Sequence, residues 1–418
     1  MANKSISVEK PKSSGIGKIV GWALGVGCFA VLGLMLARMA LQFLSPAPPA
    51  ALQLVQDIPL PSVFNNVNAN DPLLPGAGVR FDHFDFQTID PQTHLLFMVH
   101  TGPNPTRFAD DPKFDVKNDG NILVFDTRQN KVVKRIDIPQ TSGIVAAPDL
   151  GLVYAAGNGA DTIYEIDERT FNFTEIKLPP NSGPDALDYD PVDHKIFASA
   201  PGRPTDLAKN PNIDPRNQTV TVIDTATHSV TRIPMGTDGK FGDDVGHIHY
   251  DAVSHRVFVV IQPLFDQNDP NGAFAPPSFL TAIDPVSNRV TARVRLPDEC
   301  VAPHGMMIDG PQQEAFVACL DSVNLARVDL KTMKSFPDLQ PLPVKADIVT
   351  LDQSAHILYV GAGGGLALFD ESNHSLVRKA TFNYGVSTHT VAVNQETHQV
   401  YLPIPILGGR PVLRIEQY

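Results

Sequence analysis

Cysteine and tryptophan are scarce in this chain, which has three Cys and one Trp in 418 residues. The motifs Cys-x-x-Cys and Cys-x-x-Cys-His are absent, which excludes the usual signatures of thioredoxin-like redox sites and of c-type haem attachment. Gly-x-Ser-x-Gly and Walker motifs are also absent, so neither a hydrolase nucleophile elbow nor a phosphate-binding loop is indicated. Beyond residue 45 no long helical period is visible, which argues against a helical domain.

Basic residues are also few outside the N-terminal segment. Residues 1–44 hold five of the 33 Lys and Arg and one of the 45 Asp and Glu, so the remainder has 28 basic and 44 acidic residues and a net charge of −16. Nucleic acid is therefore not expected as a partner, because its binding depends on clustered Lys and Arg. The negative charge favours solubility.

What the chain does contain is a repeated unit of four short strands, seen most clearly between residues 186 and 234. The predicted strands are 186–189, 195–200, 219–223 and 229–233, joined by turns rich in Asp, Pro and Thr. An aromatic residue of the second strand recurs seven times, at Phe97, Tyr154, Phe197, Phe258, Phe316, Tyr359 and Tyr401. An acid ends the third strand seven times, at Asp126, Asp167, Asp224, Asp284, Asp329, Asp370 and Glu416.

Where no long insertion intervenes, the spacing of the aromatic residues is 42–43 residues. Four strands per unit at this period are typical of a propeller blade. The sequence therefore predicts an all-β, seven-bladed β-propeller spanning residues 52–418. The seventh unit stops at Tyr418, after its third strand. The segment Leu52–Pro61 resembles the fourth strands of other units and is predicted to supply the missing outer strand of the last blade, which leaves no open edge.

The segments LVYAAGN (152–158), ILYVGAGG (357–364) and IFASA (196–200), each followed by a hydrophobic-Asp turn, resemble the YVTN-repeat, YncE-like propellers of bacterial cell envelopes. The resemblance covers roughly residues 52–418, although a strict Tyr-Val-Thr-Asn is absent. It implies a seven-bladed propeller outside the cytoplasm and carries no catalytic motif. Trp22 lies in the N-terminal segment, which disfavours a Trp-Asp repeat propeller.

The N-terminal segment has a different character. Lysines precede an uncharged run of 19 residues, Ile19–Ala37, which is long enough to cross a bilayer. The sequence predicts a cytoplasmic N-terminus over residues 1–18, a transmembrane signal anchor over 19–44 and a linker over 45–51, with the propeller in the periplasm. The alternative is a signal peptide cleaved near Ala47–Ala51, which would release a secreted propeller.

Three units contain long loops between their second and third strands. These loops, at 101–120, 201–218 and 262–277, are rich in Pro, Asn and Asp. They are expected to emerge on one face of the propeller, where loops on a rigid scaffold commonly bind ligands. Neutral insertion is the alternative.

The links that enter the first strands hold a second signal, because first strands line the central channel. They read FDHFD, SGPD, VGHIHY, APHG, KAD and STHT. The residues predicted to converge on the mouth of the channel as ligand-binding groups are His83, Asp85, Asp185, His247, His249, His304, Asp347 and His389. Imidazole and carboxylate groups bind divalent metal ions, and His247, His304 and His389 are the candidate metal ligands. An organic or peptide ligand without metal, or ordered water alone, are the alternatives.

A separate set of histidines follows an Asp or Asn by four residues in the turn between the first and second strands. Its members are His94, His194, His255, His356 and His398. This recurrence predicts turn chemistry on the face opposite the mouth, with local side-chain to backbone hydrogen bonds. His228 and His374 occupy the corresponding turns between third and fourth strands and are interpreted in the same way.

Cys300 precedes the first strand of blade five and Cys319 ends its second strand, so a disulfide between them is predicted for a protein outside the cytoplasm. Two separate buried thiols are the alternative. Two functions remain open. One is a membrane-anchored binding or scaffold protein that presents the mouth and the loops to a small-molecule or protein ligand. The other is a metal-dependent hydrolase, lyase or redox enzyme that uses the His/Asp cluster. Gluconolactonases, streptogramin lyases and nitrous oxide reductase are superficially similar propellers, but no ligand set carries over from them.

Overall fold

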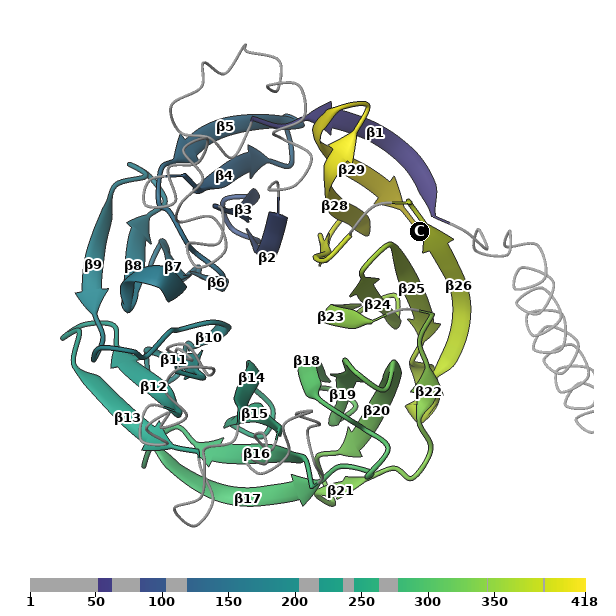
Figure 1. The fold of residues 1–418 in the computed structure, drawn as a ribbon. Coiled ribbons are helices and arrows are strands. Elements are labelled where there is room, and N and C mark those ends of the chain that lie inside the picture. The colour runs from purple at the N-terminus through teal and green to yellow at the C-terminus, as the bar shows by residue number, and fades with distance from the viewer. Residues whose placement is uncertain are drawn as a thin grey trace, which may run out of the picture. The chain divides into compact units, whose positions relative to one another are not determined.

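The computed structural model describes residues 52–61, 83–102, 119–202, 218–235, 244–262, 277–343, 345–385 and 388–418. Within these ranges the strands pair in chain order to form seven antiparallel sheets around a central axis (Figure 1). Each blade has four main strands, which confirms the predicted all-β, seven-bladed propeller. The predicted anchor at 19–44 and most of the three long loops lie outside the described residues.

The first four blades contain strands β2 to β17. Blade 1 is β2 (His83–Asp90), β3 (Leu95–Thr101), β4 (Asn121–Asp126) and β5 (Lys131–Ile136). Blade 2 is β6 (Ile144–Ala147), β7 (Leu152–Gly157), β8 (Thr162–Asp167) and β9 (Phe173–Lys177), with the short 3-10 turn η2 (Asn158–Ala160). Blade 3 is β10 (Leu187–Asp190), β11 (Lys195–Ala200), β12 (Thr219–Asp224) and β13 (Val230–Pro234). Blade 4 is β14 (Asp244–Asp251), β15 (Arg256–Gln262), β16 (Phe279–Asp284) and β17 (Arg289–Arg295).

The last three blades contain strands β18 to β29 and β1. Blade 5 is β18 (Pro303–Asp309), β19 (Glu314–Cys319), β20 (Asn324–Asp329) and β21 (Lys334–Ser335), and the short β22 (Gln340–Pro341) also pairs with β20. Blade 6 is β23 (Ala346–Asp352), β24 (Ile357–Ala362), β25 (Gly365–Asp370) and β26 (Val377–Asn383), with the 3-10 turn η4 (Ser372–His374). Blade 7 is β27 (Ala392–Val393), β28 (Gln399–Leu407), β29 (Arg410–Gln417) and β1 (Gln53–Pro59).

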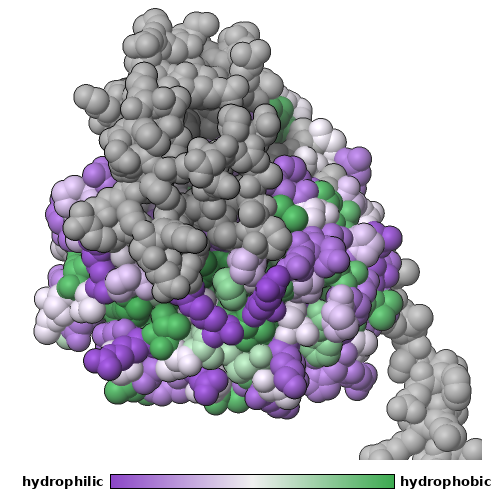
Figure 2. Space-filling view, turned by 60° about the horizontal axis from the view of Figure 1, so that its bottom comes forward, coloured by the Kyte–Doolittle hydropathy of each residue, from purple (hydrophilic) through white to green (hydrophobic). Residues whose placement is uncertain are grey.

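The hydrophobic core consists of seven clusters, each between two adjacent blades. The seven second-strand aromatics noted in the sequence, from Phe97 to Tyr401, are fully buried in these clusters. Second and third strands such as β3 and β4 are covered on both faces and therefore have continuous hydrophobic sequences, whereas outer strands such as β5 are mostly exposed or partly buried. Figure 2 shows hydrophilic residues interspersed with small hydrophobic patches on the propeller surface, as expected where apolar residues such as Leu54 and Val192 are exposed singly.

Strand β1 closes the ring, as the sequence predicted. It pairs antiparallel with β29 from Gln53↔Gln417 to Pro59↔Val412, so the outer strand of blade 7 comes from the opposite end of the propeller sequence (Figure 1). Asp57 accepts two hydrogen bonds from the Arg414 guanidinium, at 2.8 and 2.7 Å. Ile58 is only 9% exposed. Pairing, ion pair and burial together fix β1 on the blade edge.

Blade 5 contains the predicted disulfide. Cys300 and Cys319 form a disulfide bond and are 19 residues apart in the sequence. Both residues are buried, and they belong to the hydrophobic cluster between blades 4 and 5. The bond ties the segment that leads into β18 to the end of β19.

The second set of histidines occupies turns, as predicted. All have positive φ, from 50° at His255 to 59° at His94 and His398, a conformation more common in His, Asn and Asp than in other non-glycine residues. The preceding acid accepts local backbone hydrogen bonds, for example from Gln92 N to Asp90 Oδ1.

The sequence did not predict where these imidazoles point. His398 of blade 7 contacts Asp352 of blade 6 at 2.8 Å, and His374 of blade 6 contacts Glu314 of blade 5 at the same distance. His228 of blade 3 contacts Glu165 of blade 2 at 3.0 Å. These turn histidines therefore connect each of these blades to the preceding one on the face opposite the mouth.

Between blades 1 and 2 the corresponding contact is a carboxyl pair. Glu168 accepts a hydrogen bond from Thr93 Oγ1 at 2.8 Å and is 5% exposed. Burial, followed by contact with Asp90, raises the pKa of Glu168 from 4.5 to about 8. The folded protein then binds a proton between these pH values that the unfolded chain does not bind, so stability falls as pH rises through this window.

Replacement of this carboxyl group by an amide is expected to remove that pH dependence. Glu168→Gln should have a melting temperature a few degrees above that of the wild type at pH 8.5, and this difference should shrink towards pH 5. Thermal unfolding followed by circular dichroism at both pH values measures the effect. The matched control is Glu175→Gln on the outer strand β9, where we expect no such trend. An equal response of both variants at both pH values would contradict the assignment.

Candidate metal centre

The first strand of each blade lies next to the axis, at the centre of Figure 1. These strands and the links before them bring the predicted mouth residues together at one end of the channel. His83 and Asp85 are on β2, His247 and His249 on β14, His304 on β18 and Asp347 on β23, while Asp185 and His389 shortly precede β10 and β27.

Backbone irregularities occur at the residues that carry this site. The pairing of the first with the second strand shifts register between Phe84 and Gln87, between Val245 and Ile248, between Pro303 and Met306, and between Ala346 and Val349. The residues inside these four shifts include Asp85, His247, His304 and Asp347. Such β-bulges re-aim side chains and are common next to active sites, so the bulges turn these four groups toward the axis.

Glycines allow the neighbouring blades to approach closely at the same level. A Cβ atom on Gly305 would lie 1.5 Å from the Asp347 carbonyl oxygen, and one on Gly143 would lie 2.1 Å from the Asp185 carbonyl oxygen. Both positions therefore require glycine because no larger residue leaves room for the backbone of the next blade. This role was not predicted from the sequence, although Gly143 and Gly305 stand next to mouth positions of their repeats.

The first group of side chains consists of His247, His304 and Asp347, whose ligand atoms lie within 4.8 Å of one another. Asp347 Oδ1 lies 3.3 Å from His247 Nε2 and 3.7 Å from His304 Nε2. The two imidazole rings are tilted, with centroids 5.1 Å apart. Blades 4, 5 and 6 therefore contribute one side chain each.

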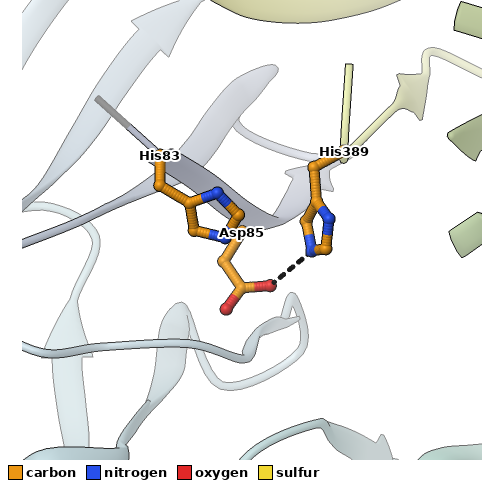
Figure 3. A group of neighbouring side chains, drawn as sticks. All are labelled: His83, Asp85 and His389. Atoms are coloured by element: carbon orange, nitrogen blue, oxygen red, sulfur yellow. Dashed lines mark ion pairs between the residues drawn. The ribbon is translucent and has the colours of Figure 1, made fainter. Parts of the chain in front are cut away.

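The second group consists of His83, Asp85 and His389, again with ligand atoms within 4.8 Å (Figure 3). His389 Nε2 lies 3.4 Å from Asp85 Oδ1, the ion pair dashed in Figure 3. The rings of His83 and His389 are 4.7 Å apart. The sequence grouped His389 with His247 and His304, whereas the structure places it with the two residues of β2.

Asp347 connects the two groups, because its second oxygen, Oδ2, lies 3.2 Å from His389 Nε2. Asp185 joins the cluster from blade 3, with Oδ2 4.0 Å from His304 Nε2. In a wide channel the side chains of distant blades would not reach one another. In this structure the side chains of six blades form one continuous network.

Electrostatics within the cluster are strongly perturbed. Burial lowers the pKa of His247 to about 4, so its imidazole is neutral near pH 7. Burial opposes charge on His389 too, but contact with Asp85 and the charge of Asp347 raise its pKa to about 9. Burial also acts on Asp347, but His304, together with His247 and His389, holds the pKa of its carboxyl group well below the usual range. A protonated His389 thus provides positive charge between two carboxylates.

The remaining carboxyl group behaves differently. Burial, followed by the negative charge of Asp85, raises the pKa of Asp185 to about 7. The negative charge around Asp185 is therefore only partly balanced, and a cation in the cluster would favour its ionised form.

Two buried polar atoms of the cluster lack hydrogen-bond partners among the described residues. They are His247 Nε2 and Asp347 Oδ1. The His247 side chain is 2% exposed, and burial of a polar atom without a partner costs about 1–3 kcal/mol. Since these two atoms lie only 3.3 Å apart, a shared cation would satisfy both.

The distances suit this interpretation. Zinc-ligand bonds of about 2.0–2.1 Å in a tetrahedral site place neighbouring ligand atoms about 3.3 Å apart. The separations of 3.3 and 3.7 Å in the first group and of 3.4 Å in the second are close to that value. Two imidazoles and one carboxylate per group are donors that Zn²⁺ and similar transition-metal ions accept.

Phe86 lies across the channel beside this cluster. It packs against hydrophobic clusters of blades 1 and 2, of blades 3 and 4, and of blades 6 and 7, and its ring centroid is 4.7 Å from that of His247. An apolar ring at this place lowers the local dielectric, which strengthens the electrostatic interactions of the cluster. Phe86 was not predicted from the sequence, because a single aromatic residue in a first strand carries no sequence signal for its position across the axis.

His249, the remaining predicted mouth residue, lies apart from both groups. Its Nδ1 is 3.3 Å from Asp188 Oδ2, and its Nε2 is 2.8 Å from the Met306 carbonyl oxygen. Both ring nitrogens thus have partners between blades 3, 4 and 5. This places His249 among the contacts between blades, outside the two groups of candidate ligands.

The segments between β3 and β4, β11 and β12, and β15 and β16 start near the mouth. His83 pairs with Thr101 at the end of β3, and Asp244, which precedes His247 on β14, pairs with Gln262 at the end of β15. The loops predicted at 101–120, 201–218 and 262–277 therefore begin on this face, although most of their residues lie outside the described ranges.

In the described part of the chain we find no helix with the length and hydrophobicity that a membrane span requires. No curated protein matches the chain. Residues 63–202 match the model of a domain of unknown function, DUF5074. This match covers about a third of the chain, from before β2 to the end of β11, and includes His83, Asp85 and Asp185.

Proposed function

We propose that this protein is a membrane-anchored, extracytoplasmic β-propeller that binds a divalent transition-metal ion at the mouth of its central channel. The observation that carries the proposal is the buried pair of His247 Nε2 and Asp347 Oδ1, which lie 3.3 Å apart and lack hydrogen-bond partners among the described residues. His304 completes a set of three ligands from three blades. Two imidazoles and a carboxylate favour Zn²⁺, Co²⁺ or Mn²⁺ over Ca²⁺, which prefers oxygen ligands alone.

The proposed location is supported by the N-terminal sequence and by the disulfide. The uncharged run Ile19–Ala37 has the length of a membrane span. The bonded pair Cys300 and Cys319 suits an oxidising compartment outside the cytoplasm. Resemblance to the YVTN-repeat, YncE-like propellers points to the same location.

An enzymatic role is the second candidate. Three protein ligands leave a coordination position open for water or substrate, which is typical of catalytic rather than structural metal sites. Asp185 lies 4.0 Å from His304 Nε2, with its pKa raised to about 7 by burial and by Asp85. A carboxyl group with this pKa at the edge of a metal site suits general acid–base work near neutral pH.

The proposal is tested by metal binding to the full-length chain in detergent. After removal of metal with a chelator, the protein is titrated with Zn²⁺ by calorimetry, and bound metal is measured by mass spectrometry. We expect bound Zn²⁺ in the wild type and at least a 100-fold loss of affinity in His247→Ala, because the buried ligand is then missing.

The matched control is His194→Ala, a turn histidine on the opposite face whose Nδ1 is 2.8 Å from Tyr189 Oη. It should bind Zn²⁺ as the wild type does. Wild-type protein that stays free of metal, or equal affinity of the His247 and His194 variants, would overturn the proposal.

A further inference from the structure

The two groups at the mouth share one carboxylate. Asp347 Oδ1 faces His247 and His304, at 3.3 and 3.7 Å, while Oδ2 faces His389 at 3.2 Å. A carboxylate with its two oxygens directed at different sets of ligands has the geometry of a bridge between two metal ions.

We infer that the channel mouth holds two divalent transition-metal ions bridged by the carboxylate of Asp347. This inference rests on the proposed function. The first ion is bound by His247, His304 and Asp347 Oδ1. The second is bound by His83, Asp85, His389 and Asp347 Oδ2.

Distances around the second ion match those around the first. His389 Nε2 lies 3.4 Å from Asp85 Oδ1 and 3.2 Å from Asp347 Oδ2, close to the separation of about 3.3 Å between neighbouring ligands of a tetrahedral ion. Figure 3 shows the imidazoles of His83 and His389 and the carboxylate of Asp85 lying next to one another. Four donor atoms of three blades are thus available to the second ion.

Loading of the full-length chain with Mn²⁺ tests the inference, because Mn²⁺ can be counted and has a distinctive paramagnetic spectrum. The wild type is expected to bind two Mn²⁺ per chain. Its electron paramagnetic resonance spectrum should show exchange coupling between the ions instead of the six lines of isolated Mn²⁺.

Variants separate the two positions. His389→Ala and the more conservative His389→Gln should each bind one Mn²⁺ per chain and give the isolated six-line spectrum. His194→Ala should retain both ions and their coupling. Circular dichroism confirms that each variant is folded.

The number of bound ions and their coupling separate the proposed function from the two-ion inference. Absence of bound metal in the wild type would overturn the proposed function. One ion per chain with the isolated spectrum would leave the proposed function standing and overturn the two-ion inference. Two ions without exchange coupling would overturn the bridging role of Asp347.

Discussion

Deletion of residues 52–61 is expected to destabilise the propeller on the order of 5 kcal/mol, because it removes the outer strand of blade 7. Leu52, Ile58 and Leu60 are 7–9% exposed in the closed ring, and burial of a large apolar side chain contributes about 1.5–3 kcal/mol. The paired Asp57 and Arg414 would also be separated. A loss of this size is a large part of the stability of an ordinary domain, which is about 5–15 kcal/mol.

Denaturant unfolding of the full-length deletion variant measures this effect. Because an open blade edge could also promote aggregation, a pair of point variants provides a matched comparison on the same strand. Ile58→Ser, at a buried position, should lower the unfolding midpoint clearly. Leu54→Ser, at a position 56% exposed, should leave it nearly unchanged. Equal midpoints for the two variants and the wild type would show that β1 does not stabilise the ring.

Removal of the disulfide is the second large effect that we expect. In the chain-entropy model, a bond that closes a loop of about 15–20 residues contributes about 3 kcal/mol by constraining the unfolded chain. The separation between Cys300 and Cys319 is 19 residues. The double variant Cys300→Ser, Cys319→Ser should therefore unfold at lower denaturant concentration, and reduction of the wild type should have a similar effect.

Thiol counting provides the control for this experiment. In unfolded, unreduced full-length protein only Cys28 should react, whereas all three cysteines of the chain should react after reduction. Three reactive thiols before reduction would contradict the bond. An unchanged unfolding midpoint in the double variant would show that the bond does not stabilise the domain.

The fold was predictable because each blade repeats the same local requirements. A second strand covered on both faces needs a large apolar residue, and this recurs from Phe97 to Tyr401. A turn needs an acid that accepts backbone hydrogen bonds, as Asp224 does from Thr227 N at 2.8 Å. The closing strand was predictable for the same reason, since residues 52–61 resemble the fourth strands of other units.

The candidate site was predictable only as a set of residues. The sequence predicted that Asp85, Asp185, His304, Asp347 and His389 converge on the mouth of the channel, and the structure brings all five into one network. Their grouping depends on features that register does not encode.

Those features are the bulges and the contacts between blades. A register shift between Pro303 and Met306 re-aims His304, and the close approach of the Asp347 carbonyl oxygen depends on Gly305 of the neighbouring blade. The partners of the turn histidines, such as Asp352 for His398, likewise belong to another repeat. Such distant pairings cannot be read from a single repeat.

Among the described residues, Phe86 reaches across the axis beside the candidate site. Its ring packs against clusters on three sides of the axis and against His247, so it obstructs the approach from the opposite face. An ion or small ligand at the mouth would therefore exchange mainly on the mouth side. The residence time of the ion would then depend on access through the mouth. A partner bound over the mouth could slow the release of the ion without contacting any of its ligands.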